Sequence, residues 1–225
     1  IGVIDQLSEA VASYGRRRAL LVTDAVLVQA GLAERVKAGF RQTAIEIACV
    51  YDQVPPNSTI RTVEDCAALG RVHGCDLIVG LGGGSVLDTA KVANVLMVKG
   101  GRVQEHMGAY LLGQTRLLPL ILIPTTAGTG SEVTKVAVIA DPEHDVKLPF
   151  AETQFLPDLA ILDPELTRSM PPKLTAATGM DALTHAIEAY VGKEWSPAAD
   201  GLALQAIRLI RDHLLLACAQ PDNLQ

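Results

Sequence analysis

Two turns rich in glycine and hydroxyl side chains each follow a short apolar run. The first is GGGS at residues 82–85, directly after the apolar residues 77–81, and the second is PTTAGTGSEVT at residues 124–134. Glycines let a ligand approach the backbone without Cβ atoms in the way, and we expect them to turn the chain with positive φ angles. A helix that begins at the first turn offers unpaired N–H groups and a partial positive charge, which suit a pyrophosphate. The first turn therefore predicts a phosphate-binding loop, with a plain strand-to-helix turn as the alternative.

The first turn matches neither of the two standard phosphate-loop fingerprints, GxGxxG and GxxxxGK[ST]. We expect Ser85 to cap the helix that follows it, and Asp88 to complete a capping box. The second turn can hydrogen-bond a nucleotide through its hydroxyl and backbone groups, although ordinary surface loops have the same composition.

Asp24 ends a third apolar stretch, Leu21-Val22-Thr23-Asp24. A carboxylate at this place can accept hydrogen bonds from both ribose hydroxyls of an adenosine and would repel a 2′-phosphate, so it favours NAD over NADP. A plain helix cap is the alternative for Asp24. Two glycine-rich turns beside one such aspartate favour nucleotide binding over an ordinary set of turns.

A separate helical pattern carries Asp181 and His185, which are four residues apart and lie on one face, with Glu188 continuing the stripe. An aspartate and a histidine one turn apart can bind the same divalent metal ion. A solvated polar face is the alternative, because two ligands rarely make a metal site and at least one more must come from elsewhere.

Short apolar runs alternate with longer helical patterns in the first three quarters of the chain. We expect strands at residues 19–22, 45–51, 77–81, 118–123, 133–140 and 160–162, and helices at residues 26–40, 59–73 and 85–97. This alternation predicts an α/β fold with a mostly parallel, Rossmann-like sheet covered on both faces.

The pattern changes near residue 167, after which two helices are expected at residues 174–191 and 198–219 with no strand between them. We therefore place an α/β dinucleotide-binding domain at residues 1–168 and the first helices of an all-α domain at residues 169–225.

The overall composition argues against several classes of partner. The chain has 225 residues and a net charge of −6, so a phosphate backbone or an anionic membrane is a poor partner for it. Its longest apolar run is too short to span a bilayer. Four cysteines without a CxxC pair favour a reducing, cytoplasmic location. The chain starts without a methionine and ends soon after a helix, so we expect a fragment.

Taken together, these motifs resemble the iron-containing alcohol dehydrogenase family over the whole chain. The strings that carry the resemblance are VTD ending at Asp24, PPNST around Asn57, GGGSVLDTAK from residue 82, PTTAGTGSEVT from residue 124, HDVKLPF around Lys147, ILDPELT from residue 161, and LTAATGMDALTHAIEAYV from residue 174. The resemblance implies an N-terminal α/β nucleotide-binding domain and a C-terminal helical metal domain. It also implies a homo-oligomer, a dimer or larger.

The resemblance assigns roles to individual residues. Asp24 takes the adenosine ribose. The pyrophosphate is held by Gly83, Gly84 and Ser85, with Asp88 near the nicotinamide side. The other cofactor contacts are Thr125, Thr126, Thr129, Asn57 and Lys147. Asp181 and His185 are the first two metal ligands, while no matching motif supplies the two later histidines of the family.

The implied activity of the whole protein is hydride transfer between NAD and a small primary alcohol or diol, assisted by Fe²⁺. A zinc-dependent polyol dehydrogenase of the glycerol type and a catalytically silent nucleotide-binding fragment are the alternatives. The general acid or base is not assigned, and neither is the alcohol.

Overall fold

The computed structural model describes residues 1–15, 17–193 and 195–223, which form two compact units. The α/β unit consists of Gly2–Thr125 and Ser131–Asp163. The helical unit consists of Ile1, Thr126–Gly130 and Pro164–Gln225. Within the described ranges, no helix combines the length and apolar character that crossing a membrane requires.

A five-stranded parallel sheet forms the centre of the α/β unit. Its strands, in sheet order, are β2 (Ile45–Tyr51), β1 (Arg17–Val22), β3 (Leu77–Gly82), β5 (Leu120–Pro124) and β8 (Leu159–Ala160). The middle strands are short apolar runs, and every residue of β3 and β5 is buried. Strands buried on both faces are typical of parallel sheets covered by helices. The predicted α/β, Rossmann-like fold is confirmed.

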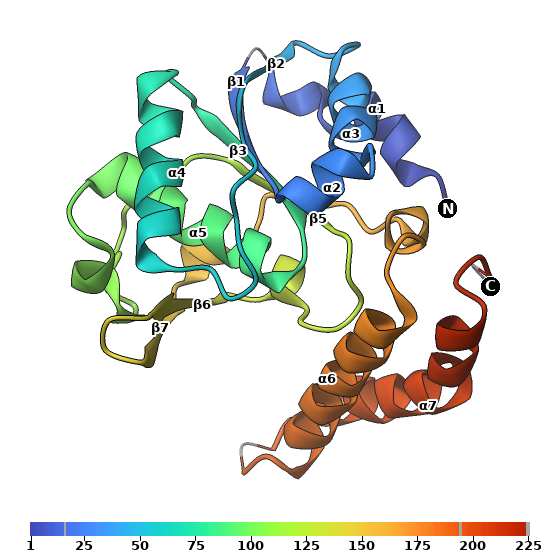
Figure 1. Cartoon of the computed structure of the whole chain (residues 1–225). Coiled ribbons are helices and arrows are strands. Elements are labelled where there is room, and N and C mark those ends of the chain that lie inside the picture. Colours follow the sequence, from blue (N-terminus) through green and yellow to red (C-terminus); the bar gives the residue numbers. More distant parts are fainter. Residues whose placement is uncertain (16, 194, 224–225) are drawn as a thin grey trace. The chain divides into compact units, whose positions relative to one another are not determined.

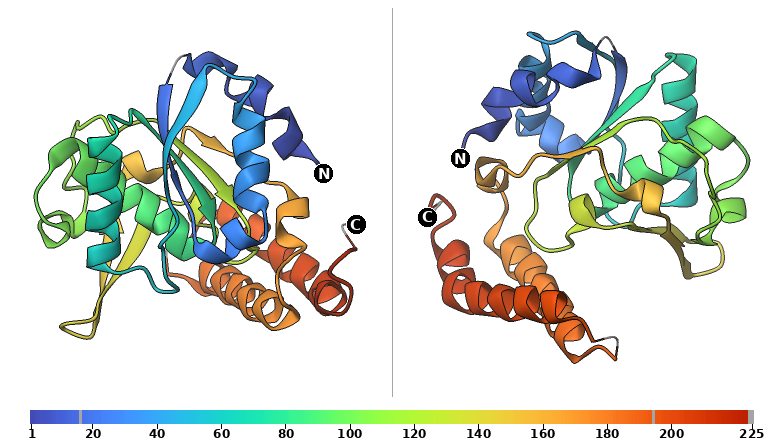
Figure 2. Two further views of the ribbon diagram at one scale, coloured as in Figure 1. Left: turned by 45° about the horizontal axis from the view of Figure 1, so that its top comes forward. Right: turned by 180° about the vertical axis from the view of Figure 1, so that it is seen from behind.

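Helices cover both faces of this sheet (Figures 1 and 2). One face carries α4 (Ile60–Val72) and α5 (Gly84–Lys99), and the other carries α1 (Leu7–Ala10), α2 (Ala25–Gln29) and α3 (Leu32–Phe40). We expected one helix over residues 26–40, and this was wrong. Gly31 has a φ angle of 77°, a left-handed conformation that ends α2 and starts α3 at a new angle.

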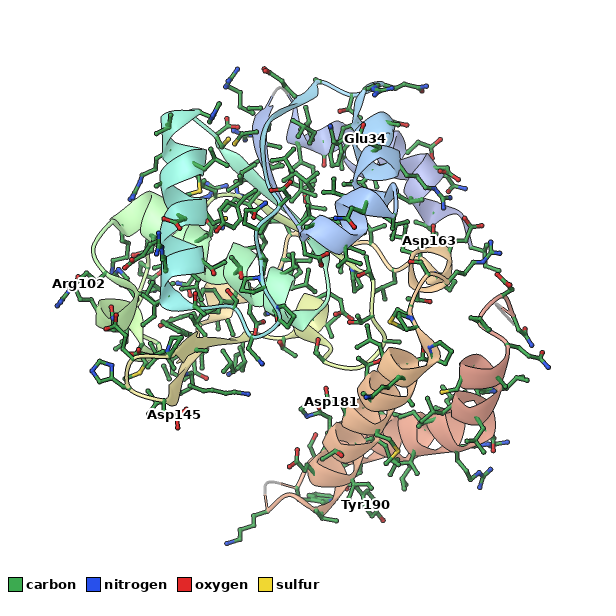
Figure 3. The ribbon with its side chains drawn as sticks, in the orientation of Figure 1. Glu34, Arg102, Asp145, Asp163, Asp181 and Tyr190 are labelled. Atoms are coloured by element: carbon green, nitrogen blue, oxygen red, sulfur yellow. The ribbon has the colours of Figure 1, made fainter. Side chains whose placement is uncertain are left out.

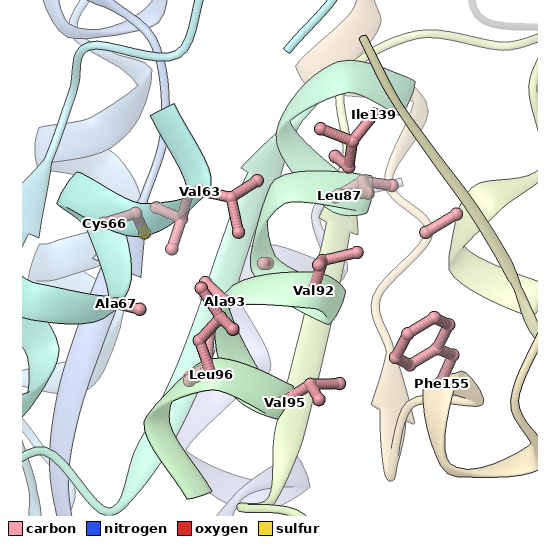
Figure 4. Packing of buried hydrophobic residues seen from close by; sticks show 14 of the residues in the cluster. Val63, Cys66, Ala67, Leu87, Val92, Ala93, Val95, Leu96, Ile139 and Phe155 are labelled. Atoms are coloured by element: carbon pink, nitrogen blue, oxygen red, sulfur yellow. The ribbon is translucent and has the colours of Figure 1, made fainter. Parts of the chain in front are cut away.

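The core of the α/β unit surrounds α5 (Figure 4). Ala93 and Leu96 of α5 lie toward Val63 of α4, while Val92 and Val95 lie toward Phe155. A helix with apolar residues on all sides is buried on all sides. The packing therefore holds α5 firmly against both the sheet and its neighbours.

A smaller sheet in the same unit has the order β4 (Gly108–Ala109), β7 (Val146–Ala151) and β6 (Val136–Asp141). The strand expected from residue 133 begins at residue 136, because Ser131–Val133 forms a 3₁₀ turn. We did not expect β7, in which Leu148 and Phe150 are buried and alternate with exposed residues. Pro149 interrupts that alternation in the sequence and argues against a strand.

The helical unit contains α6 (Pro172–Val191) and α7 (Pro197–Ala219), which confirms both helices expected after residue 167. The two helices pack on each other at Gly179, where an added Cβ would clash with the side chain of Leu214. Ser196 caps α7, because its hydroxyl accepts the N–H of Ala199.

Candidate dinucleotide-binding site

The strand order of the five-stranded sheet places two predicted site segments at the carboxyl ends of adjacent strands. The chain leaves β1 toward β2 on one side and returns to β3 on the other side. In open α/β sheets, ligands bind beyond the carboxyl ends of the strands where the strand order reverses in this way. Asp24 follows the carboxyl end of β1, and Gly83 follows that of β3. The fold therefore brings the predicted ribose ligand and the predicted phosphate loop to the same point.

Asp24 is half-buried at this point and caps α2. Its Oδ1 accepts the N–H of Leu27 at 2.9 Å. Among the described residues, its Oδ2 has no hydrogen-bond partner. The carboxylate thus serves as the helix cap through one oxygen and leaves the other free for a ligand, so the two interpretations of this residue are compatible.

The glycine turn differs in detail from the sequence prediction. Gly83 caps α5 with φ −79° and ψ −176°, which is extended backbone, so the expected positive φ angles are absent from the turn. Ser85 is not the cap, because α5 begins at Gly84. Gly82 is required for space instead, since a Cβ there would lie 2.5 Å from Cγ2 of Val86. The α5 N-terminus still has N–H groups without intrahelical partners, and the residues from Gly83 to Ser85 are partly exposed.

Asn57 reaches the start of α5 from the segment after β2. Its backbone N–H donates to Oγ of Ser85 at 3.1 Å, and its φ angle is 58°, a left-handed conformation that asparagine tolerates. The neighbouring hydroxyls of Ser58 and Thr89 lie 2.5 Å apart and are buried. These contacts unite two predicted cofactor residues that are 28 positions apart in the sequence.

Asp88 does not form the expected capping box. Its Oδ1 accepts the hydroxyl of Ser131 at 2.7 Å, and its Oδ2 accepts the N–H of Val138 at 2.9 Å. Burial raises the pKa of this carboxyl, while those two hydrogen bonds and the charge of Lys91 act in the opposite direction. Asp88 therefore binds the segment that follows the second glycine-rich turn.

Lys91 was missed as a site residue. Its side chain is fully buried, and Nζ donates to three backbone carbonyl groups in the same segment. The signal was present in the sequence, since Lys91 is the only charged residue between Asp88 and Lys99 in a mostly apolar stretch of α5. Its partners lie 40 or more residues further along the chain, where no periodicity could identify them.

Thr125 and Lys147 lie in the α/β unit. Thr125 is buried and its N–H donates to the carbonyl oxygen of Gly82 at 3.1 Å, beside the glycine turn. Lys147 is exposed on β7 and pairs with Ala140, whose N–H donates to the carbonyl oxygen of Ser58. This register places Lys147 on a strand next to the Asn57 segment.

Thr126 and Thr129 belong to the segment that groups with the helical unit. That segment contacts α6 closely at Gly128, where an added Cβ would lie 2.5 Å from the carbonyl oxygen of Thr178. Only a glycine allows this approach of the two backbones.

The predicted metal ligands lie on α6, where Figure 3 labels Asp181. Nε2 of His185 is 3.7 Å from Oδ2 of Asp181, and its Nδ1 is 3.7 Å from Oε2 of Glu188. All three side chains are about half exposed or more. Carboxylate and imidazole donors suit iron or zinc. Within the part of the chain that the structure describes, however, no group of three or more His, Cys, Asp or Glu residues could hold a metal ion.

Comparison with known proteins identifies the family. A family model described as iron-containing alcohol dehydrogenase matches residues 1–164, and a model for the C-terminal part of the same family matches residues 175–225. The chain belongs to the iron-containing alcohol dehydrogenase family. The resemblance inferred from the motifs is thereby confirmed.

Individual members of this family are similar over the whole chain. The long-chain-alcohol dehydrogenase 1 of Geobacillus thermodenitrificans (strain NG80-2) is 45% identical, over 100% of this chain and 56% of its own length. The NAD-dependent methanol dehydrogenase of Bacillus methanolicus is 38% identical, over 100% of this chain and 58% of its own length. The crystal structure of sulfoacetaldehyde reductase from Bifidobacterium kashiwanohense in complex with NAD⁺ matches with 34% identity and a TM-score of 0.89, covering 99% of this chain and 58% of that chain. The chain therefore spans a little more than half the length of these relatives.

Proposed function

We propose that this chain binds NAD at the carboxyl ends of β1 and β3, and that the whole protein is an NAD-dependent, metal-assisted alcohol dehydrogenase. The observation that carries the proposal is the reversal of strand order, which brings Asp24 and the glycine turn to the carboxyl ends of adjacent strands. A bound nicotinamide supplies hydride-transfer chemistry, for which the protein provides position and charge. Relatives named for NAD and for alcohols support the proposal.

Each predicted cofactor residue has a proposed role. Asp24 accepts from the adenosine ribose through its free oxygen, and its charge disfavours a 2′-phosphate. Gly83 and Gly84 present the N-terminus of α5 to the pyrophosphate. The remaining contacts follow the family pattern and come from Ser85, Asp88, Asn57, Thr125, Thr126, Thr129 and Lys147.

Asp181 and His185 are proposed as two ligands of a divalent metal ion, Fe²⁺ with Zn²⁺ as the alternative. Their donor atoms and their spacing on one face of α6 suit such an ion, which needs at least one further protein ligand. When bound, the ion supplies Lewis-acid chemistry to an alcohol or carbonyl oxygen. Two half-exposed ligands cannot hold it firmly by themselves.

The substrate class is a small alcohol or its aldehyde, with a primary alcohol or diol favoured. The names of the relatives include methanol, long-chain alcohols and sulfoacetaldehyde, so the family accepts chemically different substrates. A zinc-dependent polyol dehydrogenase is the second candidate for the whole protein. For the 225 residues alone, the two-ligand cluster favours nucleotide binding without turnover.

The remaining sequence predictions concern organisation and location. The domain boundary between residues 168 and 169, the cytoplasmic location and a homodimer or larger assembly stay predictions. The expected partners are small molecules, with neither nucleic acid nor membrane among them.

The proposal is tested by fluorescence titration of the chain with NADH, followed by competition with NAD and with NADP. We expect NAD to displace NADH at a concentration about tenfold or more below that required of NADP, because one repulsive charge contact of about 1.4 kcal/mol has this effect. Absence of saturable NADH binding by a folded chain would contradict the proposed site. Equal displacement by NAD and NADP would contradict the role of Asp24.

A further inference from the structure

Lys91 lies near the middle of α5, and its side chain is completely shielded from solvent. Nζ donates to the carbonyl oxygens of Ser131 at 2.6 Å, Thr134 at 3.0 Å and Val136 at 2.8 Å. Lysine is almost never fully buried unless its charge has partners. Three backbone carbonyl groups are therefore gathered around one buried side chain.

The number of acceptors fits the protonated form. An ammonium group has three N–H donors, and each can meet one of the three carbonyl oxygens. A neutral amine has two donors and would turn a lone pair toward the third carbonyl. Burial lowers the pKa of Lys91 to about 8, while Asp88 and Glu132 oppose this shift, so the amine is charged at neutral pH.

Asp88 binds the same segment from one turn earlier on α5, at Ser131 and Val138. The two side chains together bond to six backbone or hydroxyl groups between residues 131 and 138, including the hydroxyl of Thr134 at 3.4 Å from Nζ of Lys91. This segment comprises the 3₁₀ turn Ser131–Val133 and the first residues of β6. It follows immediately after Thr126–Gly130, which carries two of the predicted cofactor threonines.

The other end of that glycine-rich loop is fixed as well. The N–H of Thr125 donates to the carbonyl oxygen of Gly82, in the strand that leads into the phosphate turn. The loop is thus attached at Thr125 to β3 and at Ser131 to α5. Both anchors belong to the elements that carry the glycine turn.

Direct contact between Lys91 and a phosphate group is excluded by the same geometry. All three donors are used on backbone carbonyls, and no part of the side chain is exposed. Its charge sits inside the protein and cannot reach a ligand without breaking those bonds.

We propose that Lys91 is a positioning residue for the dinucleotide, which fixes the C-terminal anchor of the loop between Thr125 and Ser131 relative to the glycine turn. This role rests on the proposed NAD site. Binding groups held in place before the ligand arrives do not have to be ordered by it, so loss of the anchor weakens binding.

The test compares Lys91→Met with Asn94→Leu. Asn94 is the matched control, because it is also buried on α5 and its side chain also hydrogen-bonds to the backbone of a distant segment. Its Nδ2 donates to the carbonyl of Leu118 at 2.8 Å and its Oδ1 accepts the Leu118 N–H at 3.0 Å, before β5 rather than after it. Calorimetric titration gives the Kd for NAD, and amide hydrogen exchange locates the loosened segment.

Lys91→Met is expected to raise the Kd for NAD about tenfold or more, as loss of a supporting residue does in other sites. Exchange should accelerate in peptides from residues 125–138. Asn94→Leu is expected to keep the Kd within about twofold, since changes this far from the ligand leave its contacts intact, and to accelerate exchange around residue 118 instead. Lys91→Arg is the second variant if Lys91→Met does not fold. A planar guanidinium keeps the charge but cannot match three carbonyls that converge on one atom, so the Kd should again rise.

A folded Lys91→Met or Lys91→Arg variant with the wild-type Kd would overturn the role of Lys91 alone. Equal loss of affinity in Asn94→Leu would also overturn it, since the effect would then be general loosening of α5. Failure of the wild-type chain to bind NAD would overturn the proposed function and this role with it.

Discussion

Helices α5 and α6 both carry predicted ligand-binding residues, but they are held in very different ways. Ten of the 16 residues of α5 are buried, against two of the 20 residues of α6. On α5, the polar side chains of Asp88, Lys91 and Asn94 each bond to a segment distant in sequence. On α6, Asp181 and His185 are half exposed, and the ion pairs of His185 are with Asp181 and Glu188 of the same helix.

The two candidate sites therefore differ in how firmly their residues are held. Around α5, packing and hydrogen bonds hold the groups that we propose bind a dinucleotide, before the ligand arrives. Around α6, the donors have the correct types and spacing, but the described residues include no group of three or more ligands for a metal ion. Substitutions at the start of α5 should therefore weaken NAD binding strongly, whereas substitutions of the α6 ligands should leave it almost unchanged.

The largest effect is expected from Gly83→Val, which should weaken NAD binding by about 100-fold or more because a side chain would occupy the approach to the α5 N-terminus. The backbone of Gly83 is extended, a conformation that valine also adopts, so the fold should persist. Calorimetric titration measures the affinity, and circular dichroism checks the fold. A folded variant with unchanged affinity would rule out the phosphate-loop role. Gly82→Ala serves as a contrast, because it should instead destabilise the fold through its clash with Val86.

Asp24→Asn should shift cofactor preference with little loss of stability. An asparagine oxygen can still accept the N–H of Leu27 and cap α2, whereas the negative charge is gone. The ratio of the Kd for NADP to that for NAD should fall about tenfold, equivalent to about 1.4 kcal/mol. Asp24→Gly should relax the preference in the same way without the cap. Fluorescence titration with both reduced cofactors measures the ratio. An unchanged ratio in Asp24→Asn would show that the carboxylate does not face the ribose.

A buried thiol in the α/β unit should make the free energy of unfolding depend on pH. Burial raises the pKa of the Cys66 thiol above its ordinary value of 9.0. The folded state therefore keeps this proton when the unfolded chain loses it, and stability declines as pH rises above 9. Relative to Cys66→Ala, the wild-type free energy of unfolding should decrease by about 1 kcal/mol between pH 9 and 10.

Comparing these two proteins by urea denaturation at each pH cancels the contributions of other titrating groups, including Lys91, whose lowered pKa acts with the opposite sign. Val63→Ala, at another buried position of α4, is the control for lost packing and should not change the slope. Parallel pH curves for wild type and Cys66→Ala would show that water reaches this thiol.

The smallest effect on NAD affinity is expected from Asp181→Asn and His185→Ala. Each should leave the Kd for NAD within about twofold of wild type, because neither residue is among the proposed NAD contacts and a twofold change is only about 0.4 kcal/mol. After dialysis against a chelator, the wild-type chain should retain less than about 0.1 metal ion, since two ligands do not hold an ion against competition. Retention of one metal ion per chain in elemental analysis would show that a further ligand completes the site. Turnover of ethanol or propanediol with added Fe²⁺ or Zn²⁺ would show the same.

The sequence predicts the five parallel strands and the long helices because their apolar runs and periodicities are local signals. The sequence patterns do not predict the break between α2 and α3 or the strand β7. The break at Gly31 lies within a continuous helical pattern, and β7 contains Pro149.

Some parts of the candidate site could be predicted from the sequence and others could not. The turn at Gly83, the carboxylate of Asp24 and the pair on α6 are recognisable from residue types and spacing. The partners of Asp88 and Lys91 are not, because they depend on how β6 folds back onto α5. Contacts between residues 40 or more positions apart leave no periodic trace in the sequence.

The central claim is that this chain binds a dinucleotide through groups already held in place, and that its two proposed metal ligands do not hold an ion by themselves. Calorimetric titration of NAD into the chain, before and after dialysis against a chelator, tests both halves at once. We predict saturable binding of one NAD per chain with the same Kd in both samples. Absence of binding by a folded chain, or binding that disappears with the chelator, would contradict the claim.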